Sequence, residues 1–98
     1  MSLPVILRRA AQCEFDTAAD WYEARQAGRG VAFTAAVGRV LARIAAQPEL
    51  YAPVQDDIRE ALVSGYPFAI YYRAEPTQIV VLAVFHTSRD PNEWQGRA

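Results

Sequence analysis

The chain has 98 residues, of which 52% are hydrophobic and 21% are charged. This length gives one domain, residues 1–98, and this composition is that of a folded globular protein rather than a disordered one. The formal net charge is −1 and all ten basic residues are arginine, so the sequence excludes both a global basic field for nucleic acid and a catalytic lysine.

The sequence also argues against several classes of protein. The longest apolar run, residues 79–85, is much shorter than the roughly 20 residues of a membrane span. A lone cysteine cannot form an internal disulfide, so we expect a reducing cytoplasm and a small buried helix residue at Cys13. One histidine and one cysteine far apart give no metal-ligand set, and no cofactor-binding motif is present. We therefore expect no membrane, metal or small-molecule cofactor.

The first half of the chain predicts one strand and two helices. Residues 3–7 form a short apolar run with branched side chains, which predicts a strand, and Pro4 limits that strand to a sheet edge or a strand start. Apolar residues at helical spacing then predict helices over residues 12–25 and 31–47. The joint between them is short, so we expect the helices to pack as an antiparallel hairpin.

The second half predicts three strands in a row. Residues 48–57 are predicted to be a packed loop, and residues 58–63 a strand that ends at the turn Ser64-Gly65. The next strand begins at Tyr66-Pro67 and runs to Arg73, and residues 74–78 turn the chain again. Residues 79–85 are apolar on both faces, which is typical of a strand in the middle of a sheet or under a partner.

This order of elements predicts an α+β domain, in which a strand and a helical hairpin precede a three-stranded antiparallel meander. The hairpin would cover one face of a small, mainly antiparallel sheet. The other face would then remain available to a partner.

The chain resembles the RelE/ParE superfamily of toxins from bacterial type II toxin–antitoxin modules, and within it the ParE-like and plasmid-stabilisation members. The resemblance rests on the order and spacing of FDTAADWYE, IAAQPELY, IREALVSGYPFAIYYR and VLAVFHTSRDPNEW. It implies a cognate antitoxin that wraps a helical or extended tail around the toxin. It also implies one of two targets, because ParE-like toxins bind DNA gyrase and stall it on cleaved DNA, whereas RelE-like toxins cleave mRNA on the ribosome.

Four residues would carry chemistry if the chain were such an endoribonuclease. RNA cleavage needs a base, an acid and cationic stabilisation of the phosphorane. Arg59 and Arg73 could hold the phosphate, with Arg89 beside them, and His86 could act as acid or base. The resemblance implies that Arg59, Arg73 and His86 occupy strand positions where RNase members often carry active-site groups.

The same residues also have a structural interpretation. His86 could simply end a strand and form a hydrogen bond with Asp90 or a backbone carbonyl. The two strand arginines could pair with acids near the strand ends, Asp56, Asp57 or Glu75. The slightly acidic chain and the absence of lysine also weigh against an RNase, because ribosome binding favours strongly basic proteins.

We therefore favour a ParE-like toxin that inhibits DNA gyrase by binding and is neutralised by an antitoxin on the uncovered sheet face and the groove beside the hairpin. Trp94 is expected to fold back as a lid on the end of the sheet and to anchor a partner. The expected partner-binding residues are Arg59, Tyr71, Arg73, Leu82, Val84, His86, Arg89 and Trp94. The alternatives are a ribosome-dependent mRNA interferase and a non-toxic relative that only binds an antitoxin.

Overall fold

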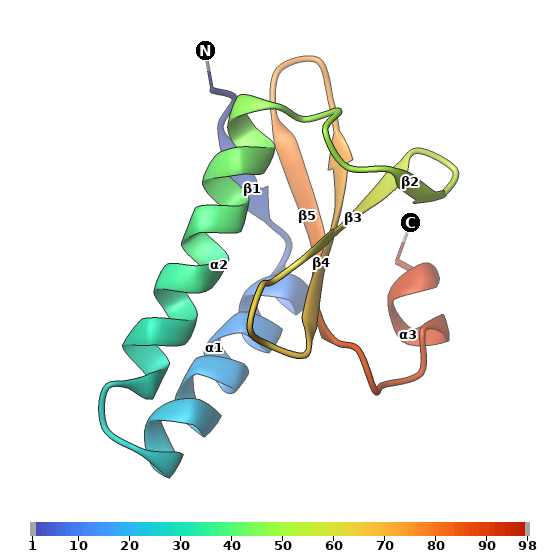
Figure 1. Cartoon of the computed structure of the whole chain (residues 1–98). Helices are drawn as coiled ribbons and strands as arrows, with labels where there is room; N and C mark the ends of the chain where they lie inside the picture. Colours follow the sequence, from blue (N-terminus) through green and yellow to red (C-terminus); the bar gives the residue numbers. More distant parts are fainter. Residues whose placement is uncertain (1, 98) are drawn as a thin grey trace.

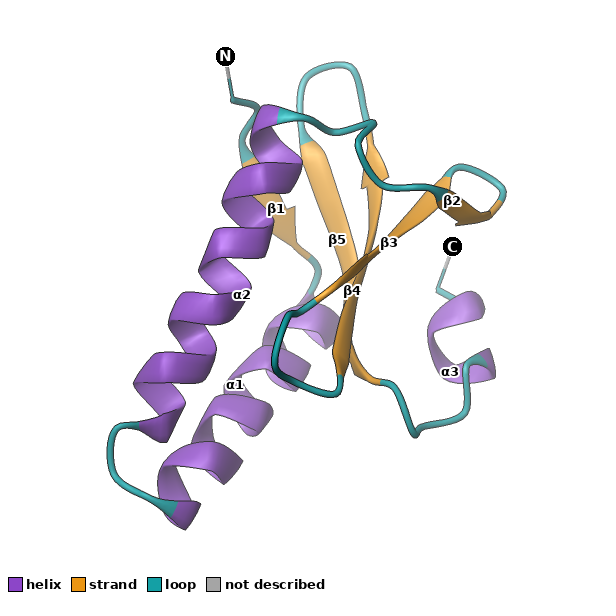
Figure 2. Ribbon diagram, in the orientation of Figure 1, coloured by secondary structure: helices purple, strands orange, loops and turns teal. Residues whose placement is uncertain are grey.

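The computed structural model describes residues 2–97. Its elements are β1 (Val5–Leu7), α1 (Arg9–Arg25), α2 (Arg29–Ala46), β2 (Pro53–Gln55), β3 (Ile58–Leu62), β4 (Phe68–Ala74), β5 (Ile79–His86) and α3 (Asn92–Gln95). Figures 1 and 2 show α1 and α2 on one side of the sheet and α3 on the other. The predicted α+β class and helical hairpin are confirmed. No helix within residues 2–97 has the length and apolar character that crossing a membrane requires.

The sheet has five strands in the order β1-β5-β4-β3-β2. The meander β3-β4-β5 is antiparallel, as predicted. The sheet as a whole is mixed, because β1 pairs in parallel with the first half of β5 at one edge. The predicted loop over residues 48–57 contains β2, which extends the other edge. β2 was not predicted, since its three residues are exposed or half-buried and show no alternating apolar pattern.

β5 is apolar on both faces because each face lies in a core, and a β-bulge interrupts its alternation. Tyr71 pairs with Ala83 but Tyr72 pairs with Val81, so Leu82 is an extra residue in β5. The extra residue shifts the alternation of side chains by one position, so Val81 and Val84 both face the helices although they are three positions apart. Leu82 and Ala83 belong to the core on the opposite face.

The larger core lies between the helical hairpin and the sheet. In α2, Phe33, Val37, Val40 and Ile44 are buried at a spacing of three or four residues, so they form one face of the helix. Phe33 is the centre of an aromatic cluster, with ring centroids 5.0–6.0 Å from those of four neighbours. These neighbours are Phe15, Tyr22, Tyr66 and Phe68.

A smaller core lies on the opposite face of the sheet, beneath α3. Trp94 is 3% exposed and stacks on Tyr71 with a centroid distance of 3.9 Å and an interplanar angle of 13°. Around this pair, Ala69, Leu82 and Phe85 are buried. The predicted lid at Trp94 is confirmed. The prediction that this face is uncovered is wrong, because the chain after β5 turns back across it.

The hairpin joint depends on one carboxylate and one glycine. Glu23 accepts hydrogen bonds from the backbone N–H groups of Gly28 and Gly30 at 3.0–3.1 Å, so it satisfies donors at the start of α2 and complements the helix dipole. A Cβ on Gly30 would lie 2.8 Å from the carbonyl oxygen of Ala19 and 2.9 Å from Glu23 Cβ. Glycine at residue 30 therefore sets how closely the two helices approach.

Two glycine substitutions in α2 should have opposite effects on stability. Gly30→Ala should lower the free energy of unfolding by about 1–3 kcal/mol, because backbone and the capping carboxylate must move to make room. Gly38→Ala should raise it by about 0.5–1 kcal/mol, since a Cβ there meets no atom within 4 Å and alanine favours the helix. Urea unfolding of the two variants beside the parent chain measures both changes. Equal effects of the two substitutions would contradict this account of the joint.

Candidate functional site

An open groove runs between α1, the start of β4 and the end of β5. Its volume is about 580 Å³ and its surface is mainly apolar, with polar side chains gathered at one end. The side of α1 contributes Cys13, Glu14, Thr17, Ala18, Trp21 and Tyr22. The sheet and the segment after β5 contribute Pro67, Phe68, Val84, His86 and Arg89.

An exposed tryptophan forms the rim of this groove on α1. Trp21 is 53% exposed, and the guanidinium of Arg25 lies 4.3 Å from the centre of its ring. Cys13, about two turns earlier along the helix, is also exposed, so the prediction that it is buried is wrong. Its position lies off the apolar stripe, which is carried by Ala11 and Ala18. Large exposed aromatic side chains are typical anchors for a partner.

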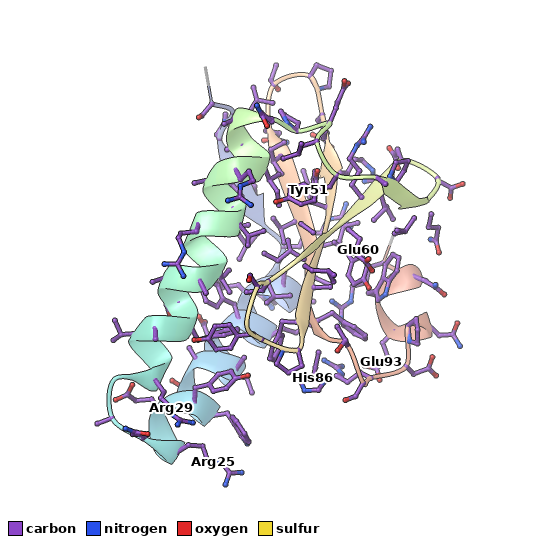
Figure 3. All side chains as sticks on the ribbon, viewed as in Figure 1. Arg25, Arg29, Tyr51, Glu60, His86 and Glu93 are labelled. Carbon is purple, nitrogen blue, oxygen red and sulfur yellow. The ribbon has the colours of Figure 1, made fainter. Side chains whose placement is uncertain are left out.

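His86 lies at the sheet end of the groove (Figure 3), with its ring 5.1 Å from that of Phe68. Its Nδ1 accepts the backbone N–H of Ser88 at 3.1 Å and lies 2.7 Å from Ser88 Oγ. A backbone N–H can only donate, so Nδ1 is the acceptor and the neutral ring carries its proton on Nε2. The predicted partners, Asp90 or a backbone carbonyl, are therefore wrong. His86 can offer Nε2–H to a bound molecule.

Glu14 holds the C-terminal segment against the sheet. Its carboxylate accepts two hydrogen bonds from Arg97 at 2.9 Å, one from Arg89 at 3.1 Å and the backbone N–H of Val84 at 3.1 Å. Arg97 also donates to the carbonyl of Leu82, and Arg89 pairs with Glu93. The hydrogen bonds from Arg97 to Glu14 raise the pKa of the Arg97 guanidinium.

Glu14 and Arg97 were missed by sequence reasoning. Acidic residues on a helix are normally expected at its solvent face, yet Glu14 is only 12% exposed. One signal was present, because Glu14 follows the buried Ala11 and precedes the buried Ala18 by three and four residues, which places it beside the apolar stripe. Its partner, 83 residues away, leaves no local pattern.

The two strand arginines point to opposite faces of the sheet. Arg59 pairs across the sheet with Tyr72, whose ring is in the helix-side core, whereas Arg73 pairs with Ile58 in the core beneath α3. Cross-strand neighbours share a face, so these two guanidinium groups do not converge on one phosphate.

Both arginines already have partners within the fold. Arg59 donates to the carbonyl oxygen of Tyr51, which fixes the connection after α2, and to none of the acids predicted for it. Arg73 forms the predicted ion pair with Asp57, at 3.1 Å. Neither arginine lines the groove that contains His86 and Arg89.

Four of the predicted partner-binding residues are buried. Tyr71, Leu82 and Trp94 lie in the core beneath α3, and Val84 lies at the floor of the groove with 1% exposure. The Tyr71 hydroxyl donates to Glu60 at 2.8 Å, and burial followed by this hydrogen bond raises the pKa of its phenol. These side chains support the site from beneath and do not form its exposed surface.

The groove is suited to binding rather than to catalysis. It combines apolar walls with His86, Arg89 and Glu14 at one end, and each of these three is held by another side chain. Within the described chain, no group of three or more His, Cys, Asp or Glu side chains is placed to hold a metal ion. An extended or helical segment with apolar residues and one polar end matches this surface.

Comparisons with known proteins give a family match and a match of fold. A family model described as the ParE toxin of the type II toxin–antitoxin system parDE matches residues 5–91. Among solved structures, a chain from the chromosomal ParDE toxin–antitoxin system of P. aeruginosa is similar with a TM-score of 0.76. The two share 13% sequence identity, and the match covers 89% of this chain and 98% of that chain. No curated protein matches the sequence.

Proposed function

Because this chain belongs to the ParE toxin family of type II toxin–antitoxin systems, we propose that it inhibits DNA gyrase by binding it and that a cognate antitoxin neutralises it. The chain would act in the cytoplasm, where gyrase works. On this proposal the toxin supplies contacts and no bond-breaking chemistry of its own.

The separation of the four candidate catalytic residues supports binding over RNA cleavage. Arg59 and Arg73 lie on opposite faces of the sheet, and His86 and Arg89 line a groove that neither of them reaches. Phosphoryl transfer to a 2′-hydroxyl needs an acid, a base and a cation around one phosphate. No such convergence occurs among the side chains described.

We propose that the antitoxin binds in the groove beside α1. Its apolar walls, with Trp21 at the rim, suit the apolar face of an antitoxin helix. At the polar end, His86 Nε2–H would donate to a backbone carbonyl or a carboxylate of the antitoxin. Arg89 is 41% exposed despite its ion pairs, so it can also reach a partner.

A gyrase assay tests the main proposal. Purified protein is added to gyrase and relaxed plasmid with ATP, and both supercoiling and cleaved plasmid are measured. We expect supercoiling to fall and cleaved DNA to accumulate with rising protein concentration. Cut messages in cells after induction, together with unimpaired supercoiling in the assay, would refute the proposal in favour of an mRNA interferase.

His86→Ala separates binding from catalysis in the same experiments. On the binding proposal, this variant should inhibit gyrase within about tenfold of the parent chain, because one lost hydrogen bond is worth about 0.5–1.5 kcal/mol at most sites. A general acid or base would instead contribute about 100-fold or more. Growth arrest on induction and gyrase inhibition are therefore measured side by side for the variant.

Hydrogen exchange tests the position of the antitoxin. The chain is produced with the product of the neighbouring antitoxin gene, and amide protection is compared with that of the free chain. We expect added protection in α1 and in the segment from Val84 to Arg89. The amides of Arg39 and Arg43 in α2 should keep the protection they have in the free chain, so they serve as an internal reference. Protection confined to β2 and β3 would move the antitoxin to another surface.

A further inference from the structure

The ten arginines of this chain fall into two groups. Five of them form hydrogen bonds or ion pairs with described residues on or near the sheet: Arg8, Arg59, Arg73, Arg89 and Arg97. The other five belong to the helical hairpin, and their guanidinium groups donate to no described residue: Arg9, Arg25, Arg29, Arg39 and Arg43. The hairpin therefore holds the guanidinium groups that form no hydrogen bond or ion pair with described residues, and of these Arg25 lies over the Trp21 ring.

Most of these guanidinium groups lie on α2. The helix contains three arginines and no acid, and Arg39 and Arg43 are exposed one turn apart. The remaining exposed positions along the same face are small: Ala32, Ala35, Gly38, Ala42 and Ala46. In Figure 1, α2 runs along the left edge of the molecule, with β3, β4 and β5 to its right.

The chemistry of this face favours phosphate over a protein surface. Protein interfaces depend on large buried anchors such as Trp or Tyr, and from Ala32 to Ala46 no exposed side chain on α2 is larger than threonine except the arginines. Val31, in the first turn, is the one large apolar side chain of α2 that is strongly exposed. Small residues between guanidinium groups let a charged backbone approach the helix closely, and arginine binds phosphate with two parallel hydrogen bonds.

We propose that the outer face of α2 contacts the phosphate backbone of duplex DNA through Arg29, Arg39 and Arg43. Arg43 lies fourteen positions after Arg29, so the two are about 21 Å apart along the helix at 1.5 Å per residue, which is long enough to contact several phosphates. The choice of DNA as the occupant rests on the proposed function, since gyrase would hold duplex DNA next to the bound toxin. The contact is independent of base sequence.

Binding of short duplexes tests this inference without gyrase. Fluorescence anisotropy is measured for two fluorescein-labelled duplexes of unrelated sequence and about 20 base pairs, at several salt concentrations. Three phosphate contacts predict a slope of about −3 for log K against log salt, and the double variant Arg39→Gln/Arg43→Gln should bring it to about −1. The double variant Arg25→Gln/Arg73→Gln removes the same charge elsewhere and should keep the slope near −3.

Several outcomes would overturn the inference. One is an equal slope for the two double variants, and another is a strong preference for one of the two sequences. Tighter binding of poly-glutamate than of DNA, lost in Arg39→Gln/Arg43→Gln, would assign the face to an acidic protein instead. Gyrase inhibition is assayed separately, so a toxin that inhibits gyrase but shows no phosphate contact would refute this inference and leave the proposed function standing.

Discussion

Trp94→Ala should lower the free energy of unfolding by about 3–5 kcal/mol, the usual cost of removing a large buried aromatic side chain. Trp94 is 3% exposed and provides the main apolar contact of α3 with the sheet, where it stacks on Tyr71. Typical domains of this size are stable by about 5–15 kcal/mol, so this loss would remove a large share of the total. Urea unfolding followed by tryptophan fluorescence and circular dichroism measures it.

Trp94→Phe is the matched control for this prediction. Phenylalanine keeps a ring over Tyr71, and the indole N–H that it removes has no hydrogen-bond partner among the described atoms. We therefore expect a cost of about 1–2 kcal/mol, from lost volume alone. If both variants were as stable as the parent chain, α3 would not be docked on the sheet in solution.

Glu14→Ala should cost about 3–5 kcal/mol, because it leaves the largely buried Arg97 without its carboxylate. It also leaves the backbone N–H of Val84 without its acceptor. We expect the C-terminal segment to detach, which hydrogen exchange at the amides of α3 would detect as lost protection. The unfolding free energy is measured by urea titration, and a change in its denaturant slope would report a less compact folded state.

Asp57→Asn is the control for Glu14→Ala. It removes one partner of the ion pair with Arg73, in which the Asp57 side chain is 64% exposed. Exposed pairs contribute about 0–1 kcal/mol, so this variant should be nearly as stable as the parent chain. If the two substitutions lowered the free energy of unfolding equally, the contacts of Glu14 with β5 and the C-terminal segment would stabilise the fold no more than an exposed ion pair does.

The sequence predicted the elements in which apolar residues recur at a regular spacing or form a long run. The buried stripe of α2 and the run of apolar residues in β5 were enough to place the hairpin and the meander. The parallel pairing of β1 with β5 was not predicted, because it joins residues more than 70 positions apart and apolar periodicity carries no strand direction. The sequence also did not show which face of the sheet holds Arg59, because apolar and polar side chains do not alternate clearly over residues 58–63. The structure assigns the faces, since Ile58 and Ala61 lie in different cores.

The candidate site was predicted less completely than the fold. His86 and Arg89 do lie together in the groove, as their closeness in sequence suggested. Arg59 and Arg73 do not join them, because the registers of β3 and β4 place these two side chains on opposite faces. A groove beside the hairpin was predicted, but its α1 wall was not predicted residue by residue, since only tertiary packing shows that Trp21 lies in the groove and that Glu14 is largely buried.

The contacts of Glu14 and Arg97 with β5 have a consequence for self-association. Among the residues that the structure describes, none forms a strand beside β5 beyond Val81 on the β1 side, and an open strand edge is a template for pairing with another chain. The Glu14 carboxylate accepts a hydrogen bond from Val84 N–H, and the Arg97 guanidinium donates one to Leu82 C=O. These two side chains therefore form the hydrogen bonds that a neighbouring strand would otherwise form with β5. The edge is thereby closed to a second copy of the chain, although its backbone is otherwise ready to pair. Loss of either side chain should therefore appear as aggregation at concentrations where the chain is still folded.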